Sequence, residues 1–229
     1  PQISLLNTQQ EKNEILKSFE IDFLITQEFT KSFSRLSPLE FVRDILVNKL
    51  NAKHIVIGYD HHFGRNRDAN SNQLLEFSKS FDFDVTEVEV LNKNKISVSS
   101  TKIRNLIFEG NIMDANRYLG YDFILTGNVI KGLGRGKELG FPTANINIDS
   151  KKIKPSDGVY FIYSVINKKT CYGMMNIGKN PTFIDKGYSM EVHLFDFNED
   201  LYGKELTIRL VEKIRDEMKF DSPNDLSFQ

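Results

Sequence analysis

The sequence predicts two domains of different classes, an α/β domain with a parallel sheet followed by a small antiparallel β-barrel. In the first half, segments with helical spacing of apolar residues alternate with short strand-like runs, which is typical of a parallel sheet covered by helices. In the second half, short strands separated by turn residues predominate, which is typical of a barrel. The length of 229 residues is sufficient for two domains of ordinary size.

The first clear element is signalled by Ser37-Pro38-Leu39-Glu40, a capping box with proline at the first helical position. The helix that follows is expected to bury one face, formed by Leu39, Val42, Ile45, Leu46 and Leu50. A β-branched run at 54–58 then predicts a buried strand. The other elements expected in this half are a helix at 73–80, a strand at 84–90, and helices at 102–109 and 112–119, which end at Gly110 and Gly120.

The second half is expected to be built almost entirely of strands. These are predicted at 123–130, 144–148, 158–166, 170–176, 188–195 and 205–211, with hairpin turns at 167–169 and 199–203. A last helix is expected to begin near Lys213. Because the pattern changes near residue 121, we place one domain at residues 1–120 and the other at 121–229.

Composition excludes several classes of protein. Thirty basic and thirty-one acidic residues leave a net charge of −1, which argues against a broad nucleic-acid-binding surface. The single cysteine, Cys171, cannot form an intramolecular disulfide and indicates a reducing, cytoplasmic compartment. No apolar run approaches the roughly 18 residues of a transmembrane helix, so we expect no membrane association.

A glycine-rich loop separates two of the predicted strands, between Gly132 and Asn145. The glycines at 132, 134 and 136 allow backbone amides to approach a ligand closely, and successive amides in such a turn can bind an anion. Taken alone, however, the loop fits a flexible hairpin better than a phosphate site, because glycine is common in turns.

Polar residues on two of the predicted strands could carry chemistry. Thr143 and Asn145 lie two residues apart, so an extended chain presents both on one face, where their oxygens could bind Mg²⁺ or simply face water. In the strand at 188–195, Met190, Val192 and Leu194 are expected to point into the barrel, and Glu191 and His193 away from it. Glu191 could act as a general base, although a cross-strand salt bridge is the commoner role.

Two stretches of the first half could bind a nucleotide. The loop at 58–67 follows a predicted parallel strand, and ligands of open α/β sheets bind at that end of a strand. It contains Arg65 and Arg67, which could contact phosphates. The stretch at 98–104 begins a helix, whose free amides favour an anion, but its hydroxyls could equally serve as plain helix caps.

Five segments in the second half carry a family resemblance: GNVIKGLGRGKELGFPTANI, PSDGVYFIYSV, GMMNIGKNPTF, MEVHLFDFNEDLYGKEL and IRDEMKF. Together they span nearly all of residues 121–221. They closely resemble the riboflavin kinase module of the bacterial bifunctional riboflavin kinase/FAD synthetase family. The resemblance implies a six-stranded antiparallel barrel that transfers the γ-phosphoryl group of ATP to the 5′-hydroxyl of riboflavin, giving FMN.

The same resemblance implies roles for individual residues. The loop with Gly132, Gly134 and Gly136 would cover the ATP phosphates. Thr143 and Asn145 would help to hold Mg²⁺, and the carboxylate of Glu191 would take the proton of the ribityl hydroxyl. Arg215 lies in a segment similar to the one that closes over the flavin, and a surface ion pair is the alternative for it.

The first half resembles the FAD synthetase module of the same family through GYDHHFGRNR and SSTKIR. This implies a Rossmann-like, nucleotidyltransferase-like domain that moves AMP from ATP onto FMN. The residues that it implies for nucleotide and flavin binding are Gly58, Asp60, Phe63, Ser99, Ser100, Thr101 and Arg104. The family's HxGH signature does not occur in these 229 residues. We expect that a segment carrying it precedes Pro1 in the complete protein, with natural loss as the alternative, and that this chain makes FAD poorly.

Three other interpretations remain open. The chain could be a non-catalytic flavin-binding or regulatory protein, although the presence of Thr143, Asn145 and Glu191 disfavours this. It could be an RNA-binding barrel fused to a nucleotidyltransferase-like domain, which the near-zero net charge and the acidic run at 196–200 disfavour. From the first half alone, it could be a nucleotidyltransferase with another substrate. The expected partners are the small molecules riboflavin, FMN and ATP.

Overall fold

The computed structural model describes residues 4–89, 92–93, 96–132, 141–178 and 188–218. Contacts divide the chain into two compact units. One consists of Pro1–Asp22 together with Ser99–Gln229, and the other of Phe23–Val98. The barrel unit is therefore formed by two separate stretches of sequence. The contact boundaries do not fall at residue 120, because the helix at 112–119 packs against the barrel and the helix at 100–109 packs against that helix.

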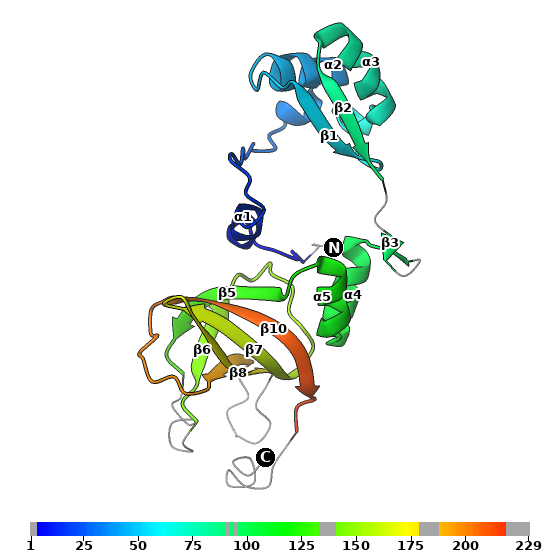
Figure 1. Cartoon of the computed structure of the whole chain (residues 1–229). Coiled ribbons are helices and arrows are strands. Elements are labelled where there is room, and N and C mark those ends of the chain that lie inside the picture. The colour runs from blue at the N-terminus through cyan, green and yellow to red at the C-terminus, as the bar shows by residue number, and fades with distance from the viewer. Residues whose placement is uncertain (1–3, 90–91, 94–95, 133–140, 179–187, 219–229) are drawn as a thin grey trace. The chain divides into compact units, whose positions relative to one another are not determined.

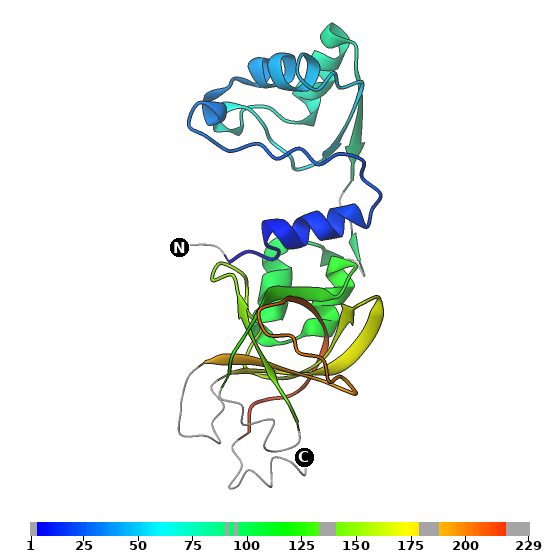
Figure 2. The same cartoon turned by 90° about the vertical axis from the view of Figure 1, so that its left-hand side faces the viewer.

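The barrel unit contains a closed six-stranded barrel in the order β10-β5-β6-β9-β8-β7 (Figures 1 and 2). Every neighbouring pair is antiparallel. The strands are β5 (Phe123–Ile130), β6 (Ala144–Ile148), β7 (Gly158–Ile166), β8 (Lys169–Gly178), β9 (Ser189–Leu194) and β10 (Glu205–Arg215). The predicted barrel and the six strand locations are confirmed.

Alternate residues of each strand fill the barrel. In β9 the side chains of Met190, Val192 and Leu194 are buried, as the alternation in the sequence predicted. The turn between β7 and β8 has positive φ at Asn167 (52°) and Lys168 (65°). Two such residues are typical of the tight turn that matches the twist of a hairpin.

Helix α5 (Ile112–Leu119) packs against β5 and β10 of the barrel, and α4 (Ser100–Glu109) packs against α5. Both end at a glycine with positive φ, Gly110 (79°) and Gly120 (81°), as the sequence predicted. The Asn116 side chain donates a hydrogen bond to the Leu210 carbonyl on β10 and accepts one from the Phe123 amide on β5. These bonds attach α5 directly to two barrel strands.

A further helix, α1 (Gln9–Lys17), was not expected from the sequence. It begins with a capping box between Thr8 and Glu11. Glu11 is fully buried, and its carboxylate lies 2.6 Å from Nζ of Lys152. The same carboxylate accepts a hydrogen bond from the Thr126 amide on β5 at 2.9 Å. Burial lowers the pKa of Lys152 to about 8, and the attraction of Glu11 opposes that shift.

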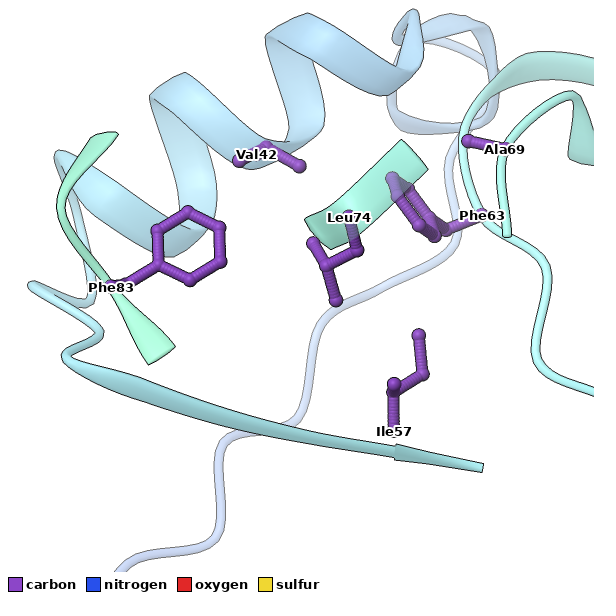
Figure 3. Close-up of a cluster of buried hydrophobic side chains, with 6 residues drawn as sticks. All are labelled: Val42, Ile57, Phe63, Ala69, Leu74 and Phe83. Carbon is purple, nitrogen blue, oxygen red and sulfur yellow. The ribbon is translucent and has the colours of Figure 1, made fainter. Parts of the chain in front are cut away.

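The second unit contains a parallel pair, β1 (His54–Gly58) and β2 (Asp84–Val88), as the sequence predicted. The expectation that the first of these strands is buried is wrong, because Val56 is 65% exposed and only Ile57 of β1 is buried. Its helices are α2 (Pro38–Glu40), a π-helix (Phe41–Val47) and α3 (Ser71–Phe81), with short 3-10 turns at Phe33–Arg35 and Arg65–Arg67 and a small hairpin of β3 (Asn92–Lys93) and β4 (Ile96–Ser97). Figure 3 shows the core between helices and sheet, made by Val42, Ile57, Phe63, Ala69, Leu74 and Phe83.

The expected buried face of the first helix is partly wrong. Val42 is fully buried, but Leu39 and Leu50 are 43% and 42% exposed. The reason is the π-helix. The amides of Asn48 and Leu50 bond to the carbonyls five residues earlier, those of Arg43 and Ile45. This wider turn rotates the flanking residues away from the face that regular α-helical spacing assigns.

The helix expected near Lys213 is also wrong. Strand β10 continues through this residue, with Lys213 opposite Tyr160 and Arg215 opposite Val159 on β7. Residues 216–218 are not helical, and those after Met218 lie outside the described part of the chain. None of the helices that the structure describes has the length and apolar character needed to cross a bilayer.

Candidate active site

The pairing of β6 with β9 brings Thr143, Asn145 and Glu191 together. Asn145 lies directly opposite Glu191, and Thr143 immediately precedes β6. The Thr143 hydroxyl donates a long hydrogen bond of 3.4 Å to Oε2 of Glu191. Residues that are far apart in the sequence thus converge on one outer face of the barrel.

The Glu191 carboxylate is held from both sides. Oε1 accepts a hydrogen bond from the Ser189 hydroxyl at 3.1 Å, while Oε2 faces Thr143. Ser189 and Glu191 share a face because they lie two residues apart on β9. The sequence interpretation gave Ser189 no role, although its position two residues before Glu191 is a readable signal.

Gly132 lies against the Asn145 side chain. A methyl group added at Gly132 would overlap the amide nitrogen of Asn145. The glycine therefore allows the Asn145 amide to occupy this position next to the start of the loop. The other two glycines of the expected phosphate loop, Gly134 and Gly136, lie outside the described residues.

A pocket opens beside Thr143. It is lined by Thr143 and Pro142, by Val192 and Leu194 of β9, and by the turn at 199–202. The wall is apolar on the side of β9 and acidic at Glu199 and Asp200. Of the three polar site residues, only Thr143 lines this pocket, so the pocket adjoins the Asn145 and Glu191 side chains and does not contain them.

The donor set suits a magnesium ion that binds together with substrate. Thr143 supplies a hydroxyl and Asn145 an amide oxygen, both hard oxygen donors, and the Glu191 carboxylate lies beside them. Within the described ranges, no group of three or more His, Cys, Asp or Glu side chains could hold a metal by itself. Few protein ligands are typical of Mg²⁺ that also keeps water and phosphate oxygens.

Arg215 is the last residue of β10 and donates to the carbonyl of Asp216 at 3.1 Å. Nearby, Lys213 Nζ donates to Ser156 Oγ at 2.9 Å and lies 2.6 Å from the Asp216 carboxylate. Burial and the Asp157 carboxylate raise the pKa of Tyr188 to about 12. Charged and phenolic groups therefore surround this end of β10, and the sequence interpretation named only Arg215 among them.

In the second unit, Gly58 is the final residue of β1, and Asp60 lies in the turn closed by the bond from the His61 amide to the Gly58 carbonyl. Both therefore stand at the expected carboxyl end of a parallel strand. The Phe63 side chain is instead 7% exposed and packs in the core, with its ring 5.8 Å from that of Phe41. It fixes the base of the loop, and its role in binding stays a prediction.

The expected residues at the start of α4 lie in the barrel unit. The Ser99 hydroxyl accepts a hydrogen bond from the Lys102 amide at 3.3 Å, which is helix capping. Ser100 and Thr101 form the first turn of the helix. Arg104 Nε donates to the Ser4 carbonyl at 2.9 Å. Any part of these residues in nucleotide binding stays a prediction.

Two family models match the chain. A riboflavin kinase model (Flavokinase) matches residues 119–229, and an FAD synthetase model matches residues 1–102. The barrel with its oxygen-rich site and the α/β region thus define a transferase class with a kinase part and an adenylyltransferase part.

Curated relatives agree with both models. Proteins described as bifunctional riboflavin kinase/FMN adenylyltransferase are 41% identical in Buchnera aphidicola subsp. Schizaphis graminum (98% of this chain, 73% of the relative) and 36% identical in Listeria monocytogenes (100% and 72%). The Escherichia coli K12 relative is 32% identical (98% and 72%). The chain belongs to the bifunctional riboflavin kinase/FMN adenylyltransferase family.

A solved structure shares the fold at a TM-score of 0.84 and 33% identity, covering 96% of this chain and 71% of the other. It is the crystal structure of a Streptococcus pneumoniae protein described as a macrolide-efflux protein. That description belongs to the other protein, whereas both family models matched here are those of flavin enzymes.

Proposed function

We propose that the barrel transfers the γ-phosphoryl group of ATP to the 5′-hydroxyl of riboflavin, giving FMN and ADP. The observation that carries this proposal is the convergence of Thr143 and Asn145 with Glu191 across β6 and β9. Phosphoryl transfer needs positioned charge and a base within reach of the attacking hydroxyl more than it needs covalent chemistry by the protein.

In the proposed step, Glu191 accepts the proton of the ribityl hydroxyl as its oxygen bonds to the γ-phosphorus. The bond from that phosphorus to the bridging oxygen breaks, and ADP leaves with the electron pair. An alcohol is a weak nucleophile, so a fixed carboxylate beside it lowers the barrier. The hydroxyls of Ser189 and Thr143 contact one carboxylate oxygen each and orient the base.

Thr143 Oγ1 and Asn145 Oδ1 are the proposed protein ligands of Mg²⁺. When bound, the ion would neutralise charge on the ATP phosphates. The amides of the loop with Gly132, Gly134 and Gly136 are proposed to contact the same phosphates. Arg215 is proposed to lie against the flavin.

We propose a second activity, the transfer of AMP from ATP to FMN to give FAD. It is supported by the FAD synthetase model at residues 1–102 and by the bifunctional relatives. The residues proposed for nucleotide and flavin binding are Gly58, Asp60, Phe63, Ser99, Ser100, Thr101 and Arg104. A cytoplasmic location is part of the proposal and rests on the single cysteine.

The kinase proposal is tested by incubating the chain with Mg²⁺, ATP and riboflavin and separating riboflavin, FMN and FAD by chromatography. We expect FMN from the wild type. Glu191→Gln keeps the shape of the side chain and removes the base, so FMN formation should fall at least 100-fold. The affinity for Mg²⁺·ADP, measured by calorimetry, should change little.

A wild type that binds riboflavin and ATP but makes no FMN would contradict the kinase proposal. Wild-type turnover in the Glu191→Gln variant would show that Glu191 is not the base in the reaction. FAD among the products supports the second activity, whereas FMN that accumulates without FAD, when ATP is in excess, counts against it for this chain.

A further inference from the structure

His193 lies beside the proposed site without a role in it. It is on the same face of β9 as Glu191, two residues further along. Its Nδ1 lies 2.9 Å from the carbonyl oxygen of Pro142. A carbonyl oxygen can only accept, so Nδ1 carries the proton and donates this hydrogen bond.

The bond reaches the residue that precedes Thr143. The β6–β9 ladder pairs Asn145 with Glu191 and Ala144 with Val192, and its register, continued by one residue, places Thr143 opposite His193. Pro142 has no amide hydrogen and cannot donate to β9. The His193 side chain therefore adds a hydrogen bond from β9 to the carbonyl of a residue whose nitrogen has no hydrogen to donate.

Two aromatic neighbours fix the imidazole ring. The ring of Phe141 lies 5.5 Å away at 83°, and that of Phe195 lies 5.7 Å away at 68°. Both contacts are edge-to-face, the arrangement that aromatic rings prefer. Rotation of the imidazole would break both contacts, so they keep Nδ1 directed at the Pro142 carbonyl.

We propose that His193 is a positioning residue for the phosphoryl transfer proposed above. Its Nδ1–H bond to Pro142 holds Thr143 in place to bind Mg²⁺·nucleotide beside Glu191. His193 acts through Pro142 and touches no reacting atom. The inference rests on the proposed function, but its first readout is nucleotide binding and needs no turnover.

The test compares two substitutions that separate the aromatic ring of His193 from its hydrogen-bond donor. His193→Phe keeps an aromatic ring between Phe141 and Phe195 and removes the donor. His193→Asn removes the ring and keeps an N–H at nearly the position of Nδ1. The matched control is Tyr163→Phe, which removes one hydrogen bond elsewhere on the barrel, the 2.8 Å bond to Asp122.

We expect His193→Phe to weaken Mg²⁺·ADP binding about 5- to 10-fold in calorimetry, the effect of one lost hydrogen bond. The KM for ATP and the Mg²⁺ concentration for half-maximal activity should rise by a similar factor, while the KM for riboflavin stays within about 2-fold. His193→Asn should recover most of the binding, and Tyr163→Phe should bind as the wild type does. If His193→Phe does not fold, His193→Leu takes its place.

Wild-type Mg²⁺·ADP affinity in the donor-free variant overturns the inference. An equal loss of Mg²⁺·ADP affinity in His193→Asn also overturns the inference, because the aromatic ring and not the donor would then matter. An equal loss of affinity in Tyr163→Phe overturns it too, because it would indicate a general effect on the barrel. If the wild type makes no FMN but the donor-free variant still binds Mg²⁺·ADP less tightly, the proposed kinase function fails and the positioning role stands.

Discussion

Residue 132 has no room for a β-carbon, because that atom would overlap the side-chain amide of Asn145. Gly132→Ala should therefore push this amide away from its place opposite Glu191. Because Asn145 is a proposed ligand of Mg²⁺, we expect kcat/KM for ATP to fall about 10-fold, which corresponds to about 1.4 kcal/mol. Steady-state kinetics at varied ATP and Mg²⁺ measure the effect.

Asn147→Ala provides the control for this prediction, since Asn147 is exposed and lies two residues from Asn145 on the same strand. It should retain wild-type kinetics. If Gly132→Ala also retained them, the close contact between residue 132 and Asn145 would have no part in nucleotide binding.

For these individual residues, the sequence predicted to which side of a strand each side chain points, but not which residues of different strands come together. Alternation along β9 was enough to predict that the side chains of Glu191 and His193 point away from the barrel interior, while that of Val192 points into it. It could not show that Asn145 pairs with Glu191, because strand order in a barrel depends on distant contacts. The contact of His193 was missed for the same reason, since its partner Pro142 lies in the segment before β6, 51 residues away in the sequence.

Among the elements, the sequence was most reliable where local signals and packing agree. Strands β5 and β7 begin and end at the predicted residues, because turn residues and glycines mark the segments on either side of them. The helix expected near Lys213 failed because pairing with β7 outweighs the helical preference of a charged segment. The missed helix α1 had a visible signal, the Thr8–Glu11 capping box. Its short apolar pattern was too weak to interpret.

Helix α1 depends on the buried Glu11–Lys152 pair. Lys152→Met should leave the Glu11 charge buried without its partner and destabilise the barrel unit by about 3–5 kcal/mol. The double variant Glu11→Gln/Lys152→Met should recover most of this loss, because Gln retains an oxygen for the Thr126 amide. Denaturant unfolding measures both.

The control for this prediction is Glu11→Gln alone, which leaves the Lys152 ammonium buried and should also destabilise. If Lys152→Met were as stable as the wild type, the ion pair would not be what holds α1 on the barrel.

For the whole molecule, two units with separate cores predict two unfolding steps. In calorimetry, Mg²⁺·ADP at 100 times its dissociation constant should stabilise the barrel step by about 2.7 kcal/mol if the kinase site binds it. Lys152→Met should lower the same step and leave the step of residues 23–98 unchanged. A single cooperative transition that both perturbations move would contradict independent units.

The buried ion pair also constrains when helix α1 can dock during synthesis of the chain. Glu11 and Lys152 are 141 residues apart in the chain, and residues 23–98 lie between them. At about 5–20 residues per second, the ribosome adds Lys152 roughly 7 to 28 s after Glu11. The intervening unit can fold on the nascent chain in that time. Helix α1 is therefore made before its ion-pair partner, and the buried contact that holds it on the barrel unit can form only after Lys152 has been made.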